Sequence, residues 1–197
     1  MEVTIRDLPP ERWPEAGAMA GRAFWTEDYM GPLGEKPIEL YATVQDVYLG
    51  MEIGTDGSVT LGAFAGNHIV GLACITPADA CFFCGMDPDA EPDDDGPIAR
   101  YFHEIDLAIR RLHVELPPHA NIGPVAVEPT LQHRGIGRKL VEASFARAAA
   151  QHPPTVSLDC DPRLLPFYES LGFRPIARVT DPWGFEIVGL RREPEPA

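Results

Sequence analysis

The sequence predicts an α/β fold in which a mixed β-sheet carries helices on its faces. Two features of the chain lead to this prediction: a β-hairpin between residues 58 and 76, and a strand-loop-helix-strand unit between residues 122 and 161. The composition agrees, because 45% hydrophobic and 23% charged residues are typical of a globular chain. With 197 residues and neither a repeat nor a linker, we expect one domain over residues 1–197.

The first half of the chain combines helix patterns with one clear hairpin. Its residue patterns predict, in order, a strand over 3–8, a helix over 11–25, a Gly- and Pro-rich loop over 26–37 and a helix over 38–49. Two runs of β-forming residues then meet at Gly66-Asn67, a pair that favours the positive φ angles of a tight turn. This pairing predicts a hairpin with strands over 58–65 and 68–76.

The second half begins with an acidic, Pro-containing surface loop over residues 86–97. After it the patterns predict a helix over 98–116, a strand over 122–127, a helix over 137–151, a strand over 155–161, a short helix over 164–171, strands over 175–180 and 185–191, and a short tail over 192–197. The strands over 122–127 and 155–161 are joined through a helix, so we expect them to be parallel with a right-handed crossover.

The charge balance limits the partners of the chain. Sixteen Lys and Arg against thirty Asp and Glu give a net charge of −14, and such a field repels nucleic acid. The acidic N-terminus lacks the pattern of a signal peptide and no run of residues is apolar enough to span a membrane, so we expect a cytoplasmic protein. Cys81 and Cys84 have metal-ligand spacing, but neither a second such pair nor a His pair follows them. We therefore expect free thiols and no metal.

One segment is suited to binding a pyrophosphate. Gly135 and Gly137 leave the backbone uncovered where a helix begins, and the first N–H groups of a helix attract anions. Arg134 and Arg138 add positive charge there. A dinucleotide-binding loop would need a third glycine where Leu140 stands, and a P-loop would need Gly-Lys-Ser/Thr, so the spacing fits neither.

The same segment resembles the motifs of the GNAT N-acetyltransferase superfamily. The matching residues are Val125-Ala126-Val127-Glu128-Pro129, the loop from Gln132 to Gly137, and Phe167-Tyr168-Glu169-Ser170-Leu171-Gly172-Phe173. The resemblance implies a mostly antiparallel sheet whose central parallel pair is splayed to hold acetyl-CoA, with helices on both faces. It also implies acetyl transfer from acetyl-CoA to a primary amine.

Positions in the motifs imply which residues bind the cofactor. By this resemblance the pantetheine hydrogen-bonds to the strand and the pyrophosphate lies on the loop. The implied cofactor-binding residues are Val125, Ala126, Val127, Gln132, His133, Arg134, Gly135, Ile136, Gly137, Arg138, Asp161 and Tyr168. Family members often carry Asn where this chain has Asp161. A backbone N–H near Val127 would polarise the thioester oxygen.

The resemblance also gives Tyr168 the role of the acid that protonates the departing thiolate. An obvious general base is missing. His119 and Asn121 share the strand parity of Val125 and Val127, so either could face the acceptor; His119 would act as a base and Asn121 would orient a water. Glu128 is a further candidate for the base.

The acceptor is not encoded in any motif of the chain. Because the chain is acidic and an amine in water is cationic, we expect a positively charged small-molecule or peptide amine. The alternative is a catalytically silent acetyl-CoA-binding module that acts as a sensor or interaction domain and needs no working acid or base.

Overall fold

The computed structural model describes residues 2–25, 57–92, 96–151 and 155–194. Within these residues seven strands form one sheet in the order β1-β2-β3-β4-β5-β7-β6. The strands are β1 Thr4–Asp7, β2 Val59–Ala65, β3 His68–Thr76, β4 His119–Val127, β5 Thr155–Cys160, β6 Arg174–Thr180 and β7 Glu186–Arg192. Only β4 and β5 pair in parallel, and all other neighbours are antiparallel. The predicted mixed sheet with one central parallel pair is confirmed.

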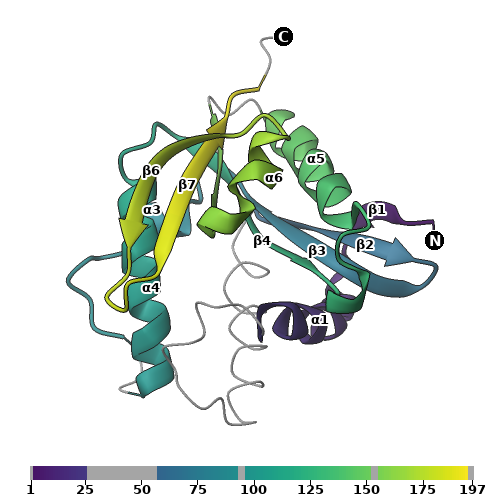
Figure 1. Cartoon of the computed structure of the whole chain (residues 1–197), viewed down its shortest axis with the longest axis horizontal. Coiled ribbons are helices and arrows are strands. Elements are labelled where there is room, and N and C mark those ends of the chain that lie inside the picture. The colour runs from purple at the N-terminus through teal and green to yellow at the C-terminus, as the bar shows by residue number, and fades with distance from the viewer. Residues whose placement is uncertain (1, 26–56, 93–95, 152–154, 195–197) are drawn as a thin grey trace.

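Helices cover both faces of this sheet, which gives three layers (Figure 1). The helices are α1 Trp13–Trp25, α3 Phe82–Gly85, α4 Pro97–His113, α5 Ile136–Ala149 and α6 Leu165–Glu169, with 3-10 turns η1 Pro10–Arg12, η3 Pro129–Leu131 and η4 Pro162–Leu164. Alternating residues of β3 separate the two faces: Leu72 and Cys74 pack toward α1, whereas Ala73 and Ile75 pack in the cluster that contains α5. The two faces therefore have separate apolar cores.

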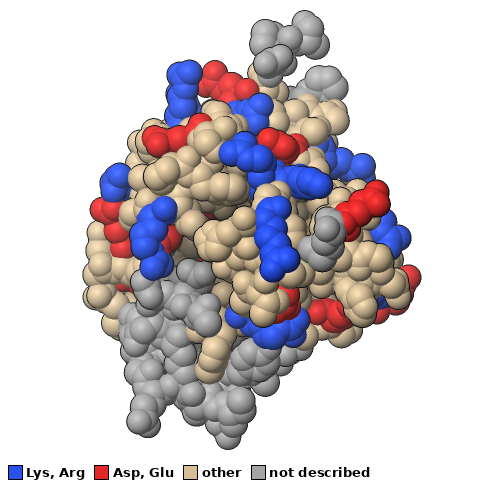
Figure 2. All heavy atoms as spheres, turned by 45° about the vertical axis from the view of Figure 1, so that its right-hand side comes forward, with Lys and Arg blue, Asp and Glu red and all other residues tan. Residues whose placement is uncertain are grey.

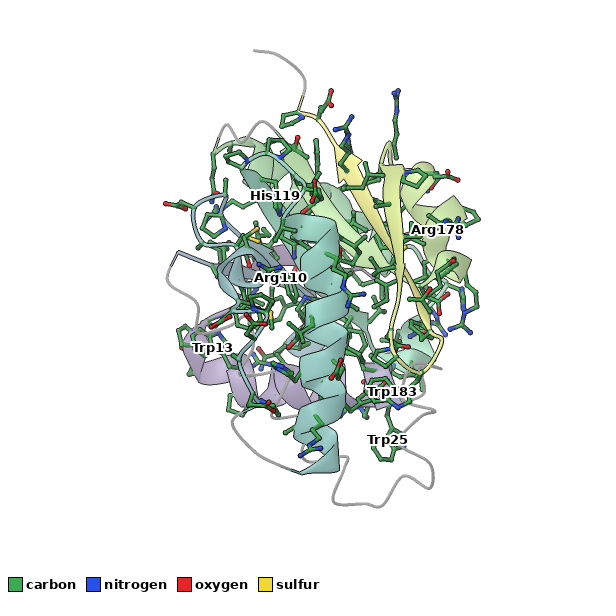
Figure 3. The ribbon with its side chains drawn as sticks, turned by 90° about the vertical axis from the view of Figure 1, so that its left-hand side faces the viewer. Trp13, Trp25, Arg110, His119, Arg178 and Trp183 are labelled. Atoms are coloured by element: carbon green, nitrogen blue, oxygen red, sulfur yellow. The ribbon has the colours of Figure 1, made fainter. Side chains whose placement is uncertain are left out.

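Helix α4 covers the α1 side of the C-terminal strands. Its residues Tyr101, Ile105 and Leu112 pack with Ile187 of β7 and with Trp25 at the end of α1, whereas the next strand residue, Val188, packs on the α5 side. Tyr101 also lies against Trp183 of the β6–β7 turn, with ring centroids 4.7 Å apart. Figure 3 shows α4 in the foreground with these strands beside it.

Most of the predicted elements are confirmed within small shifts of their ends. The hairpin turns at Gly66, whose φ is 60°. Helix α4 ends at His113, earlier than the predicted residue 116, and β4 begins at His119, earlier than the predicted residue 122. The expected loop over 26–37 and helix over 38–49 lie outside the described residues.

The acidic stretch predicted as a loop over 86–97 has neither helix nor strand in residues 86–92 and 96, and its last residue, Pro97, begins α4. Helix α3, which precedes it, was not predicted because four residues are too few to show helical periodicity. No helix in the ranges that the structure describes is both long and apolar enough to cross a membrane.

Candidate active site

The central parallel pair separates after a short region of contact. Pairing joins only residues 119–121 of β4 to residues 155–157 of β5. Just beyond this point β4 carries one extra residue: Ala73 lies opposite Val125 but Ile75 lies opposite Ile122, so two steps on β3 match three steps on β4. Such a bulge bends its strand, and Pro124 within it has no N–H to donate. The result is a gap between β4 and β5.

Backbone groups of β4 line this gap. The N–H of Glu128 donates to Val70 O at 3.0 Å, so residue 128 faces β3. Because backbone groups alternate sides along a strand, those of Val127 and Val125 face the opposite edge. The side chain of Gln132 supports this direction, since its Nε2 donates to Val127 O at 3.3 Å. The gap is therefore lined by backbone donors and acceptors that no strand of the sheet uses.

The loop between β4 and α5 opens at the same end of the gap. His133 has φ 59° and Gly135 has φ 77°, both in the left-handed region, which a residue with a side chain seldom adopts. Gly135 is the N-cap of α5, so the first N–H groups of the helix follow it without intrahelical partners. A Cβ on Gly137 would lie 3.7 Å from Phe167 Cζ and 3.8 Å from Val127 Cγ2, which is ordinary contact. Protein packing alone therefore does not require glycine at this position.

Positive charge surrounds the start of α5. Arg134, Arg138 and Lys139 are exposed, and Arg134 and Lys139 border a cavity of about 200 Å³ together with Val3 and Ile136. Figure 2 turns this side of the molecule forward and shows Lys and Arg gathering on it. Arg138 donates to Ser170 Oγ at 2.7 Å, which links the start of α5 to the end of α6. Ile136 and Ala126 are buried, so only their backbone groups remain available to a ligand.

A cleft of about 250 Å³ passes through the opened sheet. Apolar residues of α4 and β4 make up much of its wall. Its polar and ionisable lining residues are Asp106, Asn121, Asp159, Cys160, Asp161 and Tyr168. The combination of an apolar wall with a few converging polar groups is typical of a small-molecule site.

Tyr168 enters the cleft from α6. Its side chain is buried between the aromatic rings of Phe167 and Phe173, and its hydroxyl forms no hydrogen bond with the described residues. Burial, reinforced by the nearby Cys160 and Asp159, raises the pKa of this hydroxyl above its usual value. Tyr168 therefore retains its proton at neutral pH and can donate it.

Asp106 enters the same cleft from α4 and was missed from the sequence. Burial raises the pKa of its carboxyl to about 7. A carboxylate with such a pKa can take up a proton near neutral pH. A signal was present in the sequence, because Asp106 occupies the same helix face as Phe102, Ile105 and Ile109 at helical spacing. A single acid on an apolar stripe predicts a carboxylate that is at least partly buried, and Asp106 is half-buried.

The prediction that His119 and Asn121 share the strand parity of Val125 and Val127 is wrong. The extra residue in β4 reverses strand parity, so Ala120 and Ile122 share a core with Val125 and Val127, and His119 lies on the other face. His119 is 2% exposed and uses both ring nitrogens: Nδ1 lies 2.8 Å from Pro117 O and Nε2 lies 2.8 Å from His113 Nδ1. Burial lowers its pKa. Figure 3 shows His119 near one end of α4.

The other sequence candidates lie as follows. Asn121 lines the cleft, and its Oδ1 accepts a hydrogen bond from Ser157 Oγ at 3.1 Å. Asp161 also lines the cleft; burial alone would raise the pKa of its carboxyl, but hydrogen bonds and charge from Arg163 outweigh burial and lower it. Glu128 accepts hydrogen bonds from Arg22 at 2.7 and 3.1 Å and does not line the cleft. Of Asn121, Asp161 and Glu128, only the first two line the cleft that Tyr168 and Asp106 also line.

Known proteins place this fold and its motifs in one family. The chain matches the model of the acetyltransferase (GNAT) family over residues 22–173, and it therefore belongs to the GNAT acetyltransferases. No curated protein matches its sequence.

Solved structures share the fold at low sequence identity. A Corynebacterium glutamicum protein described as histone acetyltransferase HPA2 and related acetyltransferase is 17% identical with a TM-score of 0.67, over 100% of this chain and 99% of that one. The Drosophila melanogaster polyamine N-acetyltransferase, which forms N-acetylagmatine, is 14% identical with a TM-score of 0.66, over 98% and 100%. A GNAT acetyltransferase from Brucella melitensis, solved with acetyl-CoA, is 16% identical with a TM-score of 0.53, over 99% and 90%.

Proposed function

We propose that the chain transfers the acetyl group of acetyl-CoA directly to an amine bound in the same cleft. The proposal rests on three features taken together: the gap beside Val125 and Val127, the loop at Gly135, and the cleft that Tyr168 and Asp106 line. Because the seven strands join in one sheet, we also propose that residues 1–197 are a single acetyltransferase domain.

Acetyl-CoA fits the part of the site that lies at the sheet. Its pantetheine amides would add to the free backbone edge of Val125 and Val127, as an extra strand would. Its pyrophosphate would accept hydrogen bonds from the N–H groups that follow Gly135, beside Arg134 and Arg138. The uncovered space at Gly137 supports this assignment, because packing within the protein does not account for a glycine there.

The chemistry requires one group to remove a proton and another to supply one. An ammonium has no lone pair, so the Asp106 carboxylate takes a proton from the amine before or during attack. The amine nitrogen then forms a bond to the acetyl carbon while the carbon–sulfur bond breaks. The Tyr168 hydroxyl gives its proton to the departing sulfur, and the second proton that the nitrogen loses on forming the amide restores that hydroxyl. The base and the acid of this proposal lie on α4 and α6, respectively, and both line the cleft.

A cationic amine suits the charge of the cleft. Asp106, Asp159 and Asp161 place three carboxylates along it, in a chain whose net charge is −14. Negative potential in a cleft raises the local concentration of cations. The activity of the Drosophila polyamine N-acetyltransferase, a structural neighbour, also agrees with an amine acceptor.

A coupled assay tests the proposal. Release of free CoA thiol is followed with acetyl-CoA and a panel of polyamines, aminoglycosides and peptide N-termini, while calorimetry measures acetyl-CoA binding separately. We expect binding together with turnover on at least one amine. Binding without turnover on any amine would favour the silent sensor module, and no binding would overturn both functions.

A further inference from the structure

Four potential metal ligands from three separate segments meet beside the cleft. Cys81 and Cys84 flank the start of α3, His113 ends α4 and His119 begins β4. One ligand atom from each of them lies within 4.8 Å of the others. Cys81 Sγ is 3.7 Å from His113 Nδ1 and 3.7 Å from His119 Nε2. In the ranges described, these residues form a Cys₂His₂ set.

The hydrogen bonds of the two histidines determine which nitrogens carry protons. His113 Nε2 lies 3.2 Å from Asp159 Oδ1, and His119 Nδ1 lies 2.8 Å from Pro117 O. Both oxygens are acceptors, so both of these nitrogens carry the hydrogen. In the neutral rings, His113 Nδ1 and His119 Nε2 are therefore unprotonated. These two nitrogens lie 2.8 Å apart, so their lone pairs repel unless a proton or a metal ion lies between or beside them.

The spacing of the four groups agrees with tetrahedral zinc. Zinc bond lengths imply sulfur–nitrogen separations of about 3.6 Å and nitrogen–nitrogen separations of about 3.3 Å. The observed 3.7 Å distances from Cys81 Sγ to the two nitrogens match, and zinc binding would move the imidazole nitrogens apart from 2.8 Å and draw in Cys84 Sγ, which lies within 4.8 Å of the other ligand atoms. In sequence the ligands follow the pattern Cys-x₂-Cys and His-x₅-His, which is typical of structural zinc sites.

We propose that Cys81, Cys84, His113 and His119 bind one Zn²⁺ ion. The expectation from sequence that Cys81 and Cys84 have no His pair beside them was wrong, because the two histidines lie some thirty residues further along the chain and only folding brings them near. Two sulfur and two nitrogen ligands in a tetrahedron select zinc over harder cations such as Mg²⁺ or Ca²⁺.

The surrounding groups match those of a structural zinc site. Asp159 and Pro117 O orient the imidazole rings through their second nitrogens, as carboxylates and carbonyls do in zinc proteins. The N–H of Cys84 points at Cys81 Sγ, 3.2 Å away, and would stabilise a thiolate there. With four protein ligands no position stays open for substrate, so the ion joins α3, α4 and β4 rather than catalysing transfer.

The position of the site explains what the ion stabilises. Phe83, between the two cysteines, packs against the His113 ring with ring centroids 4.8 Å apart and also lines the cleft. Asp159 both orients His113 and lines the cleft. Zinc therefore holds the end of α4, the helix that carries Asp106, against the strands at the closed end of the gap.

Metal content tests the proposal directly. The untagged chain is purified without chelator in the presence of a phosphine reductant, and its zinc is measured by mass spectrometry. We expect one zinc per chain in the wild type and in His103→Gln, a control on the same helix and outside the cluster. Cys84→Ser and His113→Gln should lose the ion, and Asp159→Asn should weaken zinc binding about 10- to 100-fold.

A spectroscopic test covers the case in which the ligand variants fail to fold. Wild-type protein freed of metal is titrated with Co²⁺, which should give a thiolate-to-cobalt charge-transfer band and the intense visible absorption of tetrahedral cobalt. Addition of Zn²⁺ should abolish both and raise Tm. Wild type without zinc and without the cobalt bands overturns the proposal, as does zinc retained by folded Cys84→Ser or a Cys81–Cys84 disulfide in place of the ion.

Discussion

At the scale of single residues, the cleft brings together two groups whose pKa values are both raised by burial. Tyr168 retains its proton at neutral pH, whereas Asp106, with a pKa of about 7, exchanges its proton there. The two residues come from helices on opposite faces of the sheet, and the gap between β4 and β5 allows them to face one space. This difference in proton occupancy is what an acid and a base need.

Asp106→Asn should remove the general base. We expect kcat/KM with the best amine to fall by about 100-fold or more. In the wild type kcat/KM should rise through pH 7 as the carboxyl ionises, and this inflection should be missing from the variant. A pH–rate profile measures both effects. Asp87→Asn, an exposed acid outside the cleft, should leave the profile unchanged.

The same substitution should alter stability in a defined direction. The pKa of Asp106 is about 7 in the folded chain and near 3.8 when unfolded, so between these pH values the folded state binds more protons. Raising the pH through this range therefore lowers the free energy of unfolding. Asp106→Asn should have a higher Tm than the wild type at pH 8 and no such advantage at pH 4. Equal Tm values at pH 8 would contradict the burial of an ionised carboxylate.

Tyr168→Phe should lower turnover by about 10- to 1000-fold, because the departing sulfur loses its proton donor in the transition state. Affinity for acetyl-CoA should change little, since the ring and its packing remain. Steady-state kinetics and calorimetry separate the two quantities. If turnover is unaffected with every amine, Tyr168 acts in packing and the sulfur obtains its proton elsewhere.

At the scale of elements, the start of α5 is the proposed pyrophosphate site of acetyl-CoA. Gly137→Val should abolish acetyl-CoA binding while the chain stays folded, because a Cβ meets only ordinary contacts within the protein but enters the space of the pyrophosphate. Calorimetry measures affinity, and thermal unfolding checks the fold. Ala146→Val, the same kind of enlargement at an exposed position of α5, should bind normally. Unchanged affinity in folded Gly137→Val would refute the site.

Strand β4 is the second decisive element. Pairing with β5 ends just before the bulge at Gly123 and Pro124, and the bulge exchanges the faces of the sheet to which alternate side chains point. The backbone of Val125 and Val127 becomes available on one side of the bulge, while His119 is directed toward α4 on the other. The part of β4 proposed to bind acetyl-CoA and the part that carries the proposed zinc ligand His119 therefore lie on either side of one inserted residue.

At the scale of the whole molecule, the charge is unevenly distributed. The chain carries a net charge of −14, yet Arg134, Arg138 and Lys139 gather at the start of α5, whereas Asp106, Asp159 and Asp161 line the cleft. An anionic cosubstrate and a cationic acceptor can therefore approach regions of opposite sign. The field of each region weakens as salt shortens the screening length.

For a polyamine acceptor, kcat/KM should fall as ionic strength rises, because the cleft carboxylates attract the cation less in salt. The measurement compares polyamines with an amine of similar length that carries no charge apart from its acceptor amino group, at low and high salt. For this singly charged amine, kcat/KM should fall less. A preference for anionic acceptors, or rates indifferent to salt, would show that the charge of the cleft does not select the substrate.

The sequence alone determined the elements and the family. Strand alternation, the Gly66-Asn67 turn and the spacing from Val125 through Gly137 to Tyr168 are local, so neighbouring residues suffice to predict the hairpin, the glycine loop at the start of α5 and the parallel pair. The face to which His119 points could not be predicted in this way, because a one-residue bulge reverses parity without a distinct signal in the chain.

Only the tertiary structure decided which distant residues meet. Asp106 lines the same cleft as Tyr168 because α4 packs beside the opened strands, and Cys81 and Cys84 meet His113 and His119 because α3, α4 and β4 converge at one corner. Such meetings depend on the packing of apolar surfaces between elements far apart in sequence, and periodicity within one element carries no information about them. The proposed base and the proposed zinc ligands therefore became visible only in the folded chain.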